Sequence, residues 1–143
     1  MAVTVKKITV FRAEVDNRTG ALARALAGVV AAKGSLDVVM GYRVPGQHER
    51  AVIEVWPVSG KKVTQAADTA GLRASDTPTL LVPGVDRPGL GQAMARALAD
   101  AGIFIAGRVA QVVGRRYSAV FGFESAGEAD RAASLLKKAK PGK

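Results

Sequence analysis

The chain has no cysteine among its 143 residues and only one histidine, His48. The absence of cysteine excludes disulfides, thiolate metal sites and cysteine nucleophiles. A single histidine excludes a metal site built from several histidines of one chain. A sequence without cysteine is also typical of a cytoplasmic protein, which is the localisation we expect.

Aromatic residues are scarce as well, at 5%, although 48% of the residues are hydrophobic. This hydrophobic content excludes intrinsic disorder over most of the length. The longest uncharged apolar run, residues 25–32, is far shorter than the roughly 20 residues that a membrane helix needs. Lys6 and Lys7 interrupt the apolar residues near the start of the sequence, so we expect no signal peptide and no membrane partner.

Acidic residues are outnumbered, which leaves a net charge of +9. A basic surface of this kind is either simply solvated or binds an anionic partner such as nucleic acid. Part of the excess comes from four lysines in the last seven residues, a tail that we expect to be frayed: Lys137, Lys138, Lys140 and Lys143. We therefore expect no dedicated nucleic-acid partner.

Signals for catalysis are weak. His48 stands between Gln47 and Glu49 in a predicted hairpin turn, so we interpret it as an exposed loop residue. The glycines at 89 and 91 lack the third glycine of a dinucleotide-binding fingerprint, and no Gly-Lys-Ser/Thr follows a glycine-rich loop. We predict a protein that is not an enzyme, with no catalytic residue, no metal and no cofactor.

An internal repeat organises the sequence. Placing Gly20 on Gly89 aligns Asn17 with Asp86, and a stripe of apolar residues at helical spacing follows both glycines. We predict helices over residues 20–33 and 88–101, with Pro88 in the first helical position. Each helix is expected to end at a left-handed glycine, Gly34 or Gly102.

The pattern around these helices predicts the same order of elements in both halves. Alternating apolar residues favour strands over 8–15, 36–44 and 51–56, and over 79–85, 103–109 and 117–123. Ser59 and Ser125 are the predicted caps of a second helix in each half, and Ser125 has capping-box spacing to Glu128. Residues 72–76 are a candidate closing strand, and residues 3–7 are the candidate edge strand for the second half.

The fold class predicted from this order is α+β, with two ferredoxin-like βαββα(β) units in tandem. Each unit would have an antiparallel sheet with both helices on one face. We place the first unit over residues 1–76 and the second, with its basic tail, over residues 77–143.

The two turns resemble those of ACT domains, small modules that regulate amino-acid metabolism by binding ligands. The resemblance rests on Asp86-Arg-Pro-Gly-Leu90 followed by Gly102 and Ile103-Phe-Ile105, and on Asn17-Arg-Thr-Gly-Ala-Leu22 followed by Gly34. It covers about residues 5–138, as a tandem pair with no attached enzyme. It implies a regulatory protein that binds a free amino acid or similar small ligand, forms a homodimer and acts in trans on a metabolic enzyme.

The resemblance also implies where the ligand would lie, at the turn of one unit facing the second strand of another. Backbone N–H groups at the helix start would hold the ligand's carboxylate, and Asp86 or the carbonyl of Asn17 would take its ammonium. The implied ligand-binding residues are Asn17, Gly20, Ala21, Leu22, Asp86, Gly89, Leu90, Gly91, Ile103 and Phe104.

Two other functions stay open. The units could serve assembly alone, because exposed edge strands in such folds pair side by side. RNA-recognition modules share the element order, and residues 115–123 combine two arginines with three aromatics on one strand face. Ala119 stands at the centre of that face, where base stacking would need a ring, so we expect these aromatics to pack on the helices or in an oligomer interface.

Overall fold

Two antiparallel sheets, each with two helices, make up the computed structural model, which describes residues 3–141. One unit comprises Thr9–Asp76, and the other comprises the residues up to Ile8 together with those from Thr77 onward. We call them the first-half unit and the second-half unit. The predicted α+β class, with tandem ferredoxin-like units, is confirmed.

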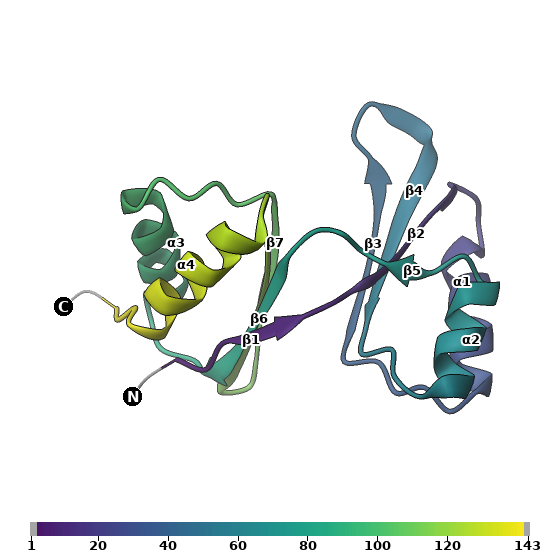
Figure 1. Cartoon of the computed structure of the whole chain (residues 1–143), viewed down its shortest axis with the longest axis horizontal. Helices are drawn as coiled ribbons and strands as arrows, with labels where there is room; N and C mark the ends of the chain where they lie inside the picture. Colours follow the sequence, from purple (N-terminus) through teal and green to yellow (C-terminus); the bar gives the residue numbers. More distant parts are fainter. Residues whose placement is uncertain (1–2, 142–143) are drawn as a thin grey trace. The chain divides into compact units, whose positions relative to one another are not determined.

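The first-half unit has the strand order β3-β4-β2-β5, and Figure 1 shows its two helices on one face of the sheet. The short closing strand expected within residues 72–76 is present and pairs with β2. In chain order, the elements are β2 (Phe11–Asp16), α1 (Ala21–Ala31), β3 (Val38–Val44), β4 (Gln47–Trp56), α2 (Lys61–Thr69) and β5 (Arg73–Ala74).

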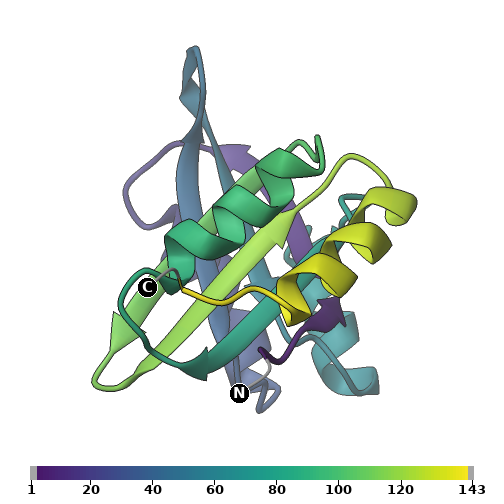
Figure 2. The same cartoon turned by 90° about the vertical axis from the view of Figure 1, so that its left-hand side faces the viewer.

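The second-half unit repeats this plan with the strand order β1-β6-β8-β7, again with both helices on one face (Figure 2). Its edge strand β1 comes from the N-terminal segment and pairs with β6 through Lys6 opposite Leu81, which confirms the predicted edge strand. The elements are β1 (Lys6–Ile8), β6 (Thr79–Val85), α3 (Leu90–Asp100), β7 (Gly107–Val113), β8 (Arg116–Gly122) and α4 (Ala126–Lys137).

Each unit has its own core, of mostly small side chains in the first-half unit and of larger ones, mainly leucines and aromatics, in the second-half unit. In the first-half unit, Val29 of α1 packs on Ile53 and Val55 of β4. In the second-half unit, Leu98 and Leu136 lie between the helices and β6 and β8. Burying each such side chain contributes about 1.5–3 kcal/mol. Within the described residues, no helix is long and apolar enough to cross a membrane.

The ends of α1 and α3 differ from prediction at one point. Gly102 is left-handed, at φ 71°, as expected. Gly34 is not: the left-handed residue after α1 is Lys33, also at φ 71°. Gly34 serves close packing instead, because a Cβ there would lie 2.7 Å from the Cγ1 of Val29.

Three further expectations were wrong. Gly60, not Ser59, is the N-cap of α2, and it makes no side-chain capping hydrogen bond. The third strand of the second-half unit, β7, begins at Gly107 rather than at residue 103. The C-terminal tail is not frayed as far as it is described, because Ala139 is buried in the core.

Candidate functional site

The two predicted turns have the same backbone geometry. The amide of Ala21 donates to the carbonyl of Arg18 at 3.0 Å, and the amide of Leu90 donates to the carbonyl of Arg87 at 3.1 Å. Gly20 and Gly89, at φ 86° and 82° with ψ near zero, occupy the third position of what are therefore type II turns. Pro88 is the second turn residue rather than the first helical residue, which corrects the expectation. Proline is favoured there because its fixed φ suits the turn.

The first turn of each helix has a backbone amide without an acceptor among the described residues. The amides of Ala21 and Leu90 are used to close the turns, so they do not face a ligand. In the described part of the chain, no acceptor is found for the amides of Leu22 and Gly91, the second residues of α1 and α3, and neither helix has a side-chain cap. Uncapped amides at a helix start attract an anion.

A guanidinium covers the first turn. Arg24 folds back so that its Nη1 donates to the carbonyl of Thr19 at 3.4 Å, and a Cβ on Gly20 would lie 2.9 Å from the same atom. Asn17 is tied to the neighbouring strand, because its Nδ2 donates to the carbonyl of His48 at 2.9 Å. The first turn is therefore already partly filled by its own side chains.

In the second turn, the glycine is covered by an uncharged residue instead of a guanidinium. Asp86 is exposed, and its amide donates to the carbonyl of Arg115 at 2.7 Å. The residue that lies against Gly89 is Pro141 of the C-terminal tail, whose Cβ would be 3.7 Å from a Cβ at position 89. Figure 2 shows this tail running from the end of α4 toward the start of α3.

A buried tyrosine lies beside the second turn. The ring of Tyr117 on β8 covers Gly84 of β6, where a Cβ would be 2.7 Å from Cε1 and 3.0 Å from the hydroxyl oxygen. Tyr117 is 8% exposed, and its hydroxyl has no hydrogen-bond partner among the described residues. Burial raises the pKa of Tyr117, and the positive charge of Arg87 in the turn lowers it in part.

The other predicted site residues differ in their exposure and in their place along the helices. The side chain of Leu90 is buried in the core, whereas Leu22 is 42% exposed beside the first turn. Ile103 is buried and Phe104 is 62% exposed, and both follow the C-terminal end of α3. Because α3 has 11 residues and rises about 1.5 Å per residue, one unit alone does not bring Phe104 to the Gly89 turn.

The aromatics behind the RNA-binding alternative face the helices. Tyr117, Phe121 and Phe123 are all buried in the core of the second-half unit, and the last two stack with ring centroids 6.3 Å apart. Base stacking needs exposed rings. This strand therefore provides no stacking surface, and the RNA-binding alternative loses the feature that favoured it.

Sequence reasoning missed Arg24, Tyr117 and Pro141 as neighbours of the turns. Arg24 had a signal, because it stands one helical turn after Gly20 and an arginine there can fold back over the helix start. Tyr117 and Pro141 had none, since their positions depend on strand pairing and on the path of the tail.

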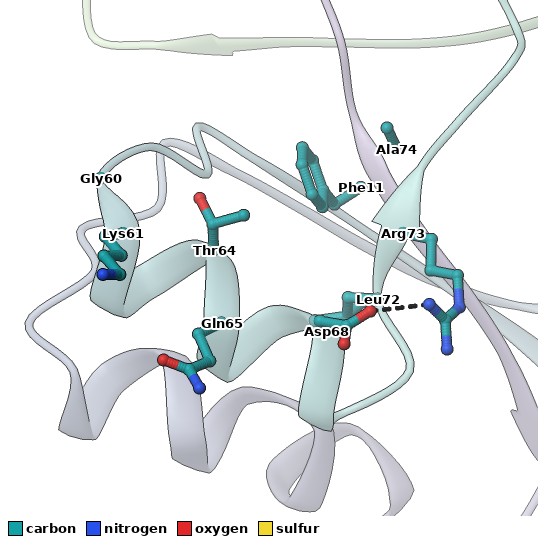
Figure 3. Close-up of a pocket in the computed structure, with 9 residues that line it drawn as sticks. All are labelled: Phe11, Gly60, Lys61, Thr64, Gln65, Asp68, Leu72, Arg73 and Ala74. Carbon is teal, nitrogen blue, oxygen red and sulfur yellow. Dashed lines mark hydrogen bonds and ion pairs between the residues drawn. The ribbon is translucent and has the colours of Figure 1, made fainter.

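A surface hollow is lined by residues of neither turn. It has a volume of about 750 Å³ and lies in the first-half unit beside α2 and the short β5 edge (Figure 3). Phe11 and Leu72 give the hollow an apolar floor. Its charged residues, Asp68 and Arg73, form an ion pair with each other, with Oδ1 and Nη1 2.7 Å apart. None of the predicted ligand-binding residues lines it.

His48 and the acidic residues form no metal site. His48 is exposed as expected, but it lies in strand β4 rather than in the turn, and its Nδ1 lies 3.0 Å from Nη1 of Arg43. No group of three or more histidine, aspartate or glutamate side chains in residues 3–141 is arranged to hold an ion.

Comparison with known proteins identifies the fold. No protein-family model matches the sequence, and no curated protein matches it. A protein from Bacteroides thetaiotaomicron matches with a TM-score of 0.71 and 13% identity, over 94% of this chain and 98% of that one. The ligand-free regulatory subunit of aspartate kinase from Thermus thermophilus matches with a TM-score of 0.62 and 18% identity, over 97% of each chain. Both matches extend over the two units, so the resemblance to ACT domains is confirmed as a likeness of fold: the chain has the tandem fold of aspartate kinase regulatory subunits.

Proposed function

We propose that this chain is a non-catalytic regulatory protein that binds a free amino acid at the turn before α3. The observation that carries the proposal is the uncapped helix start behind Gly89, where the amide of Gly91 has no acceptor among the described residues. The regulatory role is supported by the fold shared with a kinase regulatory subunit.

The chemistry of the second turn suits an amino acid. A carboxylate at the start of α3 would meet backbone N–H donors and the positive end of the helix dipole. The exposed carboxylate of Asp86 would take the ammonium on the same carbon. Gly89 lets the ligand approach the backbone, because it has no side chain. The first turn is the weaker candidate, since Arg24 already lies over Gly20.

Screening the chain against the twenty free amino acids by thermal unfolding tests the proposal. A ligand at 100 times its dissociation constant stabilises the folded state by about 2.7 kcal/mol. Gly89→Val should abolish binding, because a branched side chain would block the turn. Gly102→Val is the matched control: its backbone is equally left-handed, at φ 71°, but it lies at the other end of α3.

A second pair of variants tests the ammonium partner. Asp86→Ala should weaken binding, whereas Asp16→Ala should not, because Asp16 is paired with Arg50 at 2.6 Å. If no amino acid binds at millimolar concentration, or if Gly89→Val and Gly20→Val both bind as the unchanged chain does, the ligand proposal fails.

The second candidate function is assembly, and the edge strand β7 favours it. All seven of its residues are exposed, including Val109, Val112 and Val113. An exposed apolar edge strand is a template for pairing with another chain. We propose a homodimer formed through β7, which analytical ultracentrifugation would detect. Val109→Lys should shift it toward the monomer, and Val30→Lys on the exposed face of α1 should not.

The partner that we propose for the regulatory role is an enzyme of amino-acid metabolism, controlled in trans in the cytoplasm. The sequence similarity between the two turns and the duplicated fold support a shared sensing role rather than turnover of a substrate. Affinity capture with and without the amino acid that binds would test this, because a regulated enzyme should be retained differently in the two conditions.

A further inference from the structure

The buried hydroxyl of Tyr117 needs an explanation. A buried hydroxyl without a partner is unfavourable, and native proteins seldom retain one. The ring itself is well packed, because it fills the space above Gly84. The hydroxyl oxygen lies 3.0 Å from the Cβ position of Gly84, the last residue but one of β6, and the charge of Arg87 in the turn that follows acts on it. A missing partner of the hydroxyl would therefore lie where β6 enters the second turn.

The first-half unit has no such group. In the strand pairing, Val15 of β2 lies opposite Ala51 of β4, and Gly84 of β6 lies opposite Tyr117 of β8. The equivalent positions therefore carry a purely apolar pair in one unit and a hydroxyl in the other. This difference distinguishes the two turns more sharply than their sequences do.

The C-terminal tail covers the second turn. Ala139 anchors the tail in the core, and Pro141 follows it against Gly89. Beyond Lys137 the chain has left α4, so this segment is held by side-chain packing and by a hydrogen bond of 3.1 Å from the amide of Ala139 to the carbonyl of Leu136. A ligand that reaches the start of α3 must share the space with the tail or displace it.

We infer that the second turn is a ligand site closed by the C-terminal tail, in which the Tyr117 hydroxyl donates a hydrogen bond to the ligand's carboxylate. The inference rests on the proposed function and adds the group that selects the ligand. The amide of Gly91, Arg87 and the helix start all make the local potential positive, which favours a carboxylate over an ammonium next to the hydroxyl. The ligand class is a free α-amino acid, and an amino-acid amide would be rejected because it lacks the anion.

Calorimetry on the whole chain tests the hydroxyl. The probes are the twenty free amino acids at millimolar concentration and the carboxamide of whichever binds best. Tyr117→Phe keeps the ring over Gly84 and removes only the hydroxyl. It should weaken binding about ten- to a hundredfold, the usual range for a hydrogen bond to a charged group. Tyr42→Phe removes the other tyrosine hydroxyl, in the first-half unit, and should bind as the unchanged chain does.

Absorbance titration measures the pKa of Tyr117, which should not change on ligand addition if the residue has only a structural role. The chain has two tyrosines, so Tyr117 is observed alone in the Tyr42→Phe variant. A carboxylate that accepts from the hydroxyl should raise the pKa of Tyr117 when the amino acid is added, because it stabilises the protonated phenol. The carboxamide should leave it unchanged.

Removal of residues 140–143 tests whether the C-terminal tail covers the second turn, because it takes away Pro141 and leaves Ala139 in the core. Binding should become tighter. Unchanged affinity in the shortened chain would overturn the role of the tail. Unchanged affinity in Tyr117→Phe, with binding lost in Gly89→Val, would overturn the role of the hydroxyl and leave the proposed function standing. No binding to either the full or the shortened chain would overturn both.

Discussion

The same packing position is filled in opposite ways in the two units. In the first-half unit the side chain on β2 is the larger of the pair and its partner on β4 is the smaller, as Val15 and Ala51 show. In the second-half unit the order is reversed, with Gly84 opposite Tyr117. Each pair fills a similar volume, so a change in the size of one member alone should disturb the core packing and lower the stability.

Gly84→Ala should lower the free energy of unfolding by about 1–3 kcal/mol, because the added methyl would lie 2.7 Å from the ring of Tyr117. Urea denaturation measures the loss. Gly41→Ala is the control: it also lies in a strand, but nothing is within 4 Å of its Cβ position. An equal effect in the two variants would contradict the packing argument.

Tyr42 carries the clearest pH dependence. Its hydroxyl donates to Oε1 of Glu54 at 2.5 Å. Burial, with the hydrogen bond and charge of Glu54, raises the pKa of Tyr42 to about 12. The unfolded value is about 10, so this contribution to stability is complete below about pH 10 and is lost as the pH rises to about 12.

The urea concentration at the unfolding midpoint should therefore decrease as the pH rises from about 10 to about 12, and it should decrease less in Tyr42→Phe. Tyr42 is 46% exposed, so solvent screening keeps the effect small. Absorbance titration of Tyr117→Phe, where only Tyr42 remains, gives its pKa directly. An ordinary value near 10 would contradict the assignment.

At the scale of the element, the second helix of each unit starts differently. Ser125 caps α4 by accepting from the amide of Glu128 at 3.1 Å, as its spacing predicts. Ser125→Ala should cost about 1 kcal/mol of stability, measured by urea denaturation. Ser59→Ala, the control before α2, should cost almost nothing, because Ser59 is not the N-cap. A larger loss from Ser59→Ala would reverse this assignment.

Elements that depend on local rules could be predicted from the sequence. The periodic apolar faces of α1 and α3 and the glycines before them are local features, and both helices were found with their turns. Gly34 was misassigned because a glycine needed for close packing against Val29 looks the same in sequence as a left-handed one. The start of β7 differs from the prediction because buried Ile103, which follows α3, is tied back to that helix by a hydrogen bond from its amide to the carbonyl of Leu98.

The candidate site also has a part that could be predicted from the sequence and a part that could not. Gly20 and Gly89 could be recognised because a type II turn requires a left-handed third residue. The neighbourhood of each turn could not, because it is set by contacts between distant segments. Tyr117 reaches the second turn across a strand pair, and Pro141 reaches it from the far end of the chain. Such contacts leave no local pattern to read.

At the scale of the whole molecule, the chain does not divide cleanly at its middle. The edge strand of the second-half unit is β1, which precedes the entire first-half unit in sequence. Val3 and Ile8 from this segment are buried, and Val3 belongs to the core that contains Leu80 and Phe123. The second-half unit therefore depends on residues from the N-terminus, whereas the first-half unit is continuous.

Deletion of residues 1–8 should consequently destabilise one unit and spare the other. Loss of the buried Val3 and Ile8 side chains should cost the second-half unit roughly 3 kcal/mol or more. Trp56, the one tryptophan of the chain, ends β4 and reports on the first-half unit, whereas absorbance of Tyr117 in the Tyr42→Phe variant reports on the other. In urea, the Tyr117 midpoint should fall while that of Trp56 fluorescence stays in place. An equal fall in both would mean that the two units unfold together, and that β1 supports more than the sheet it joins.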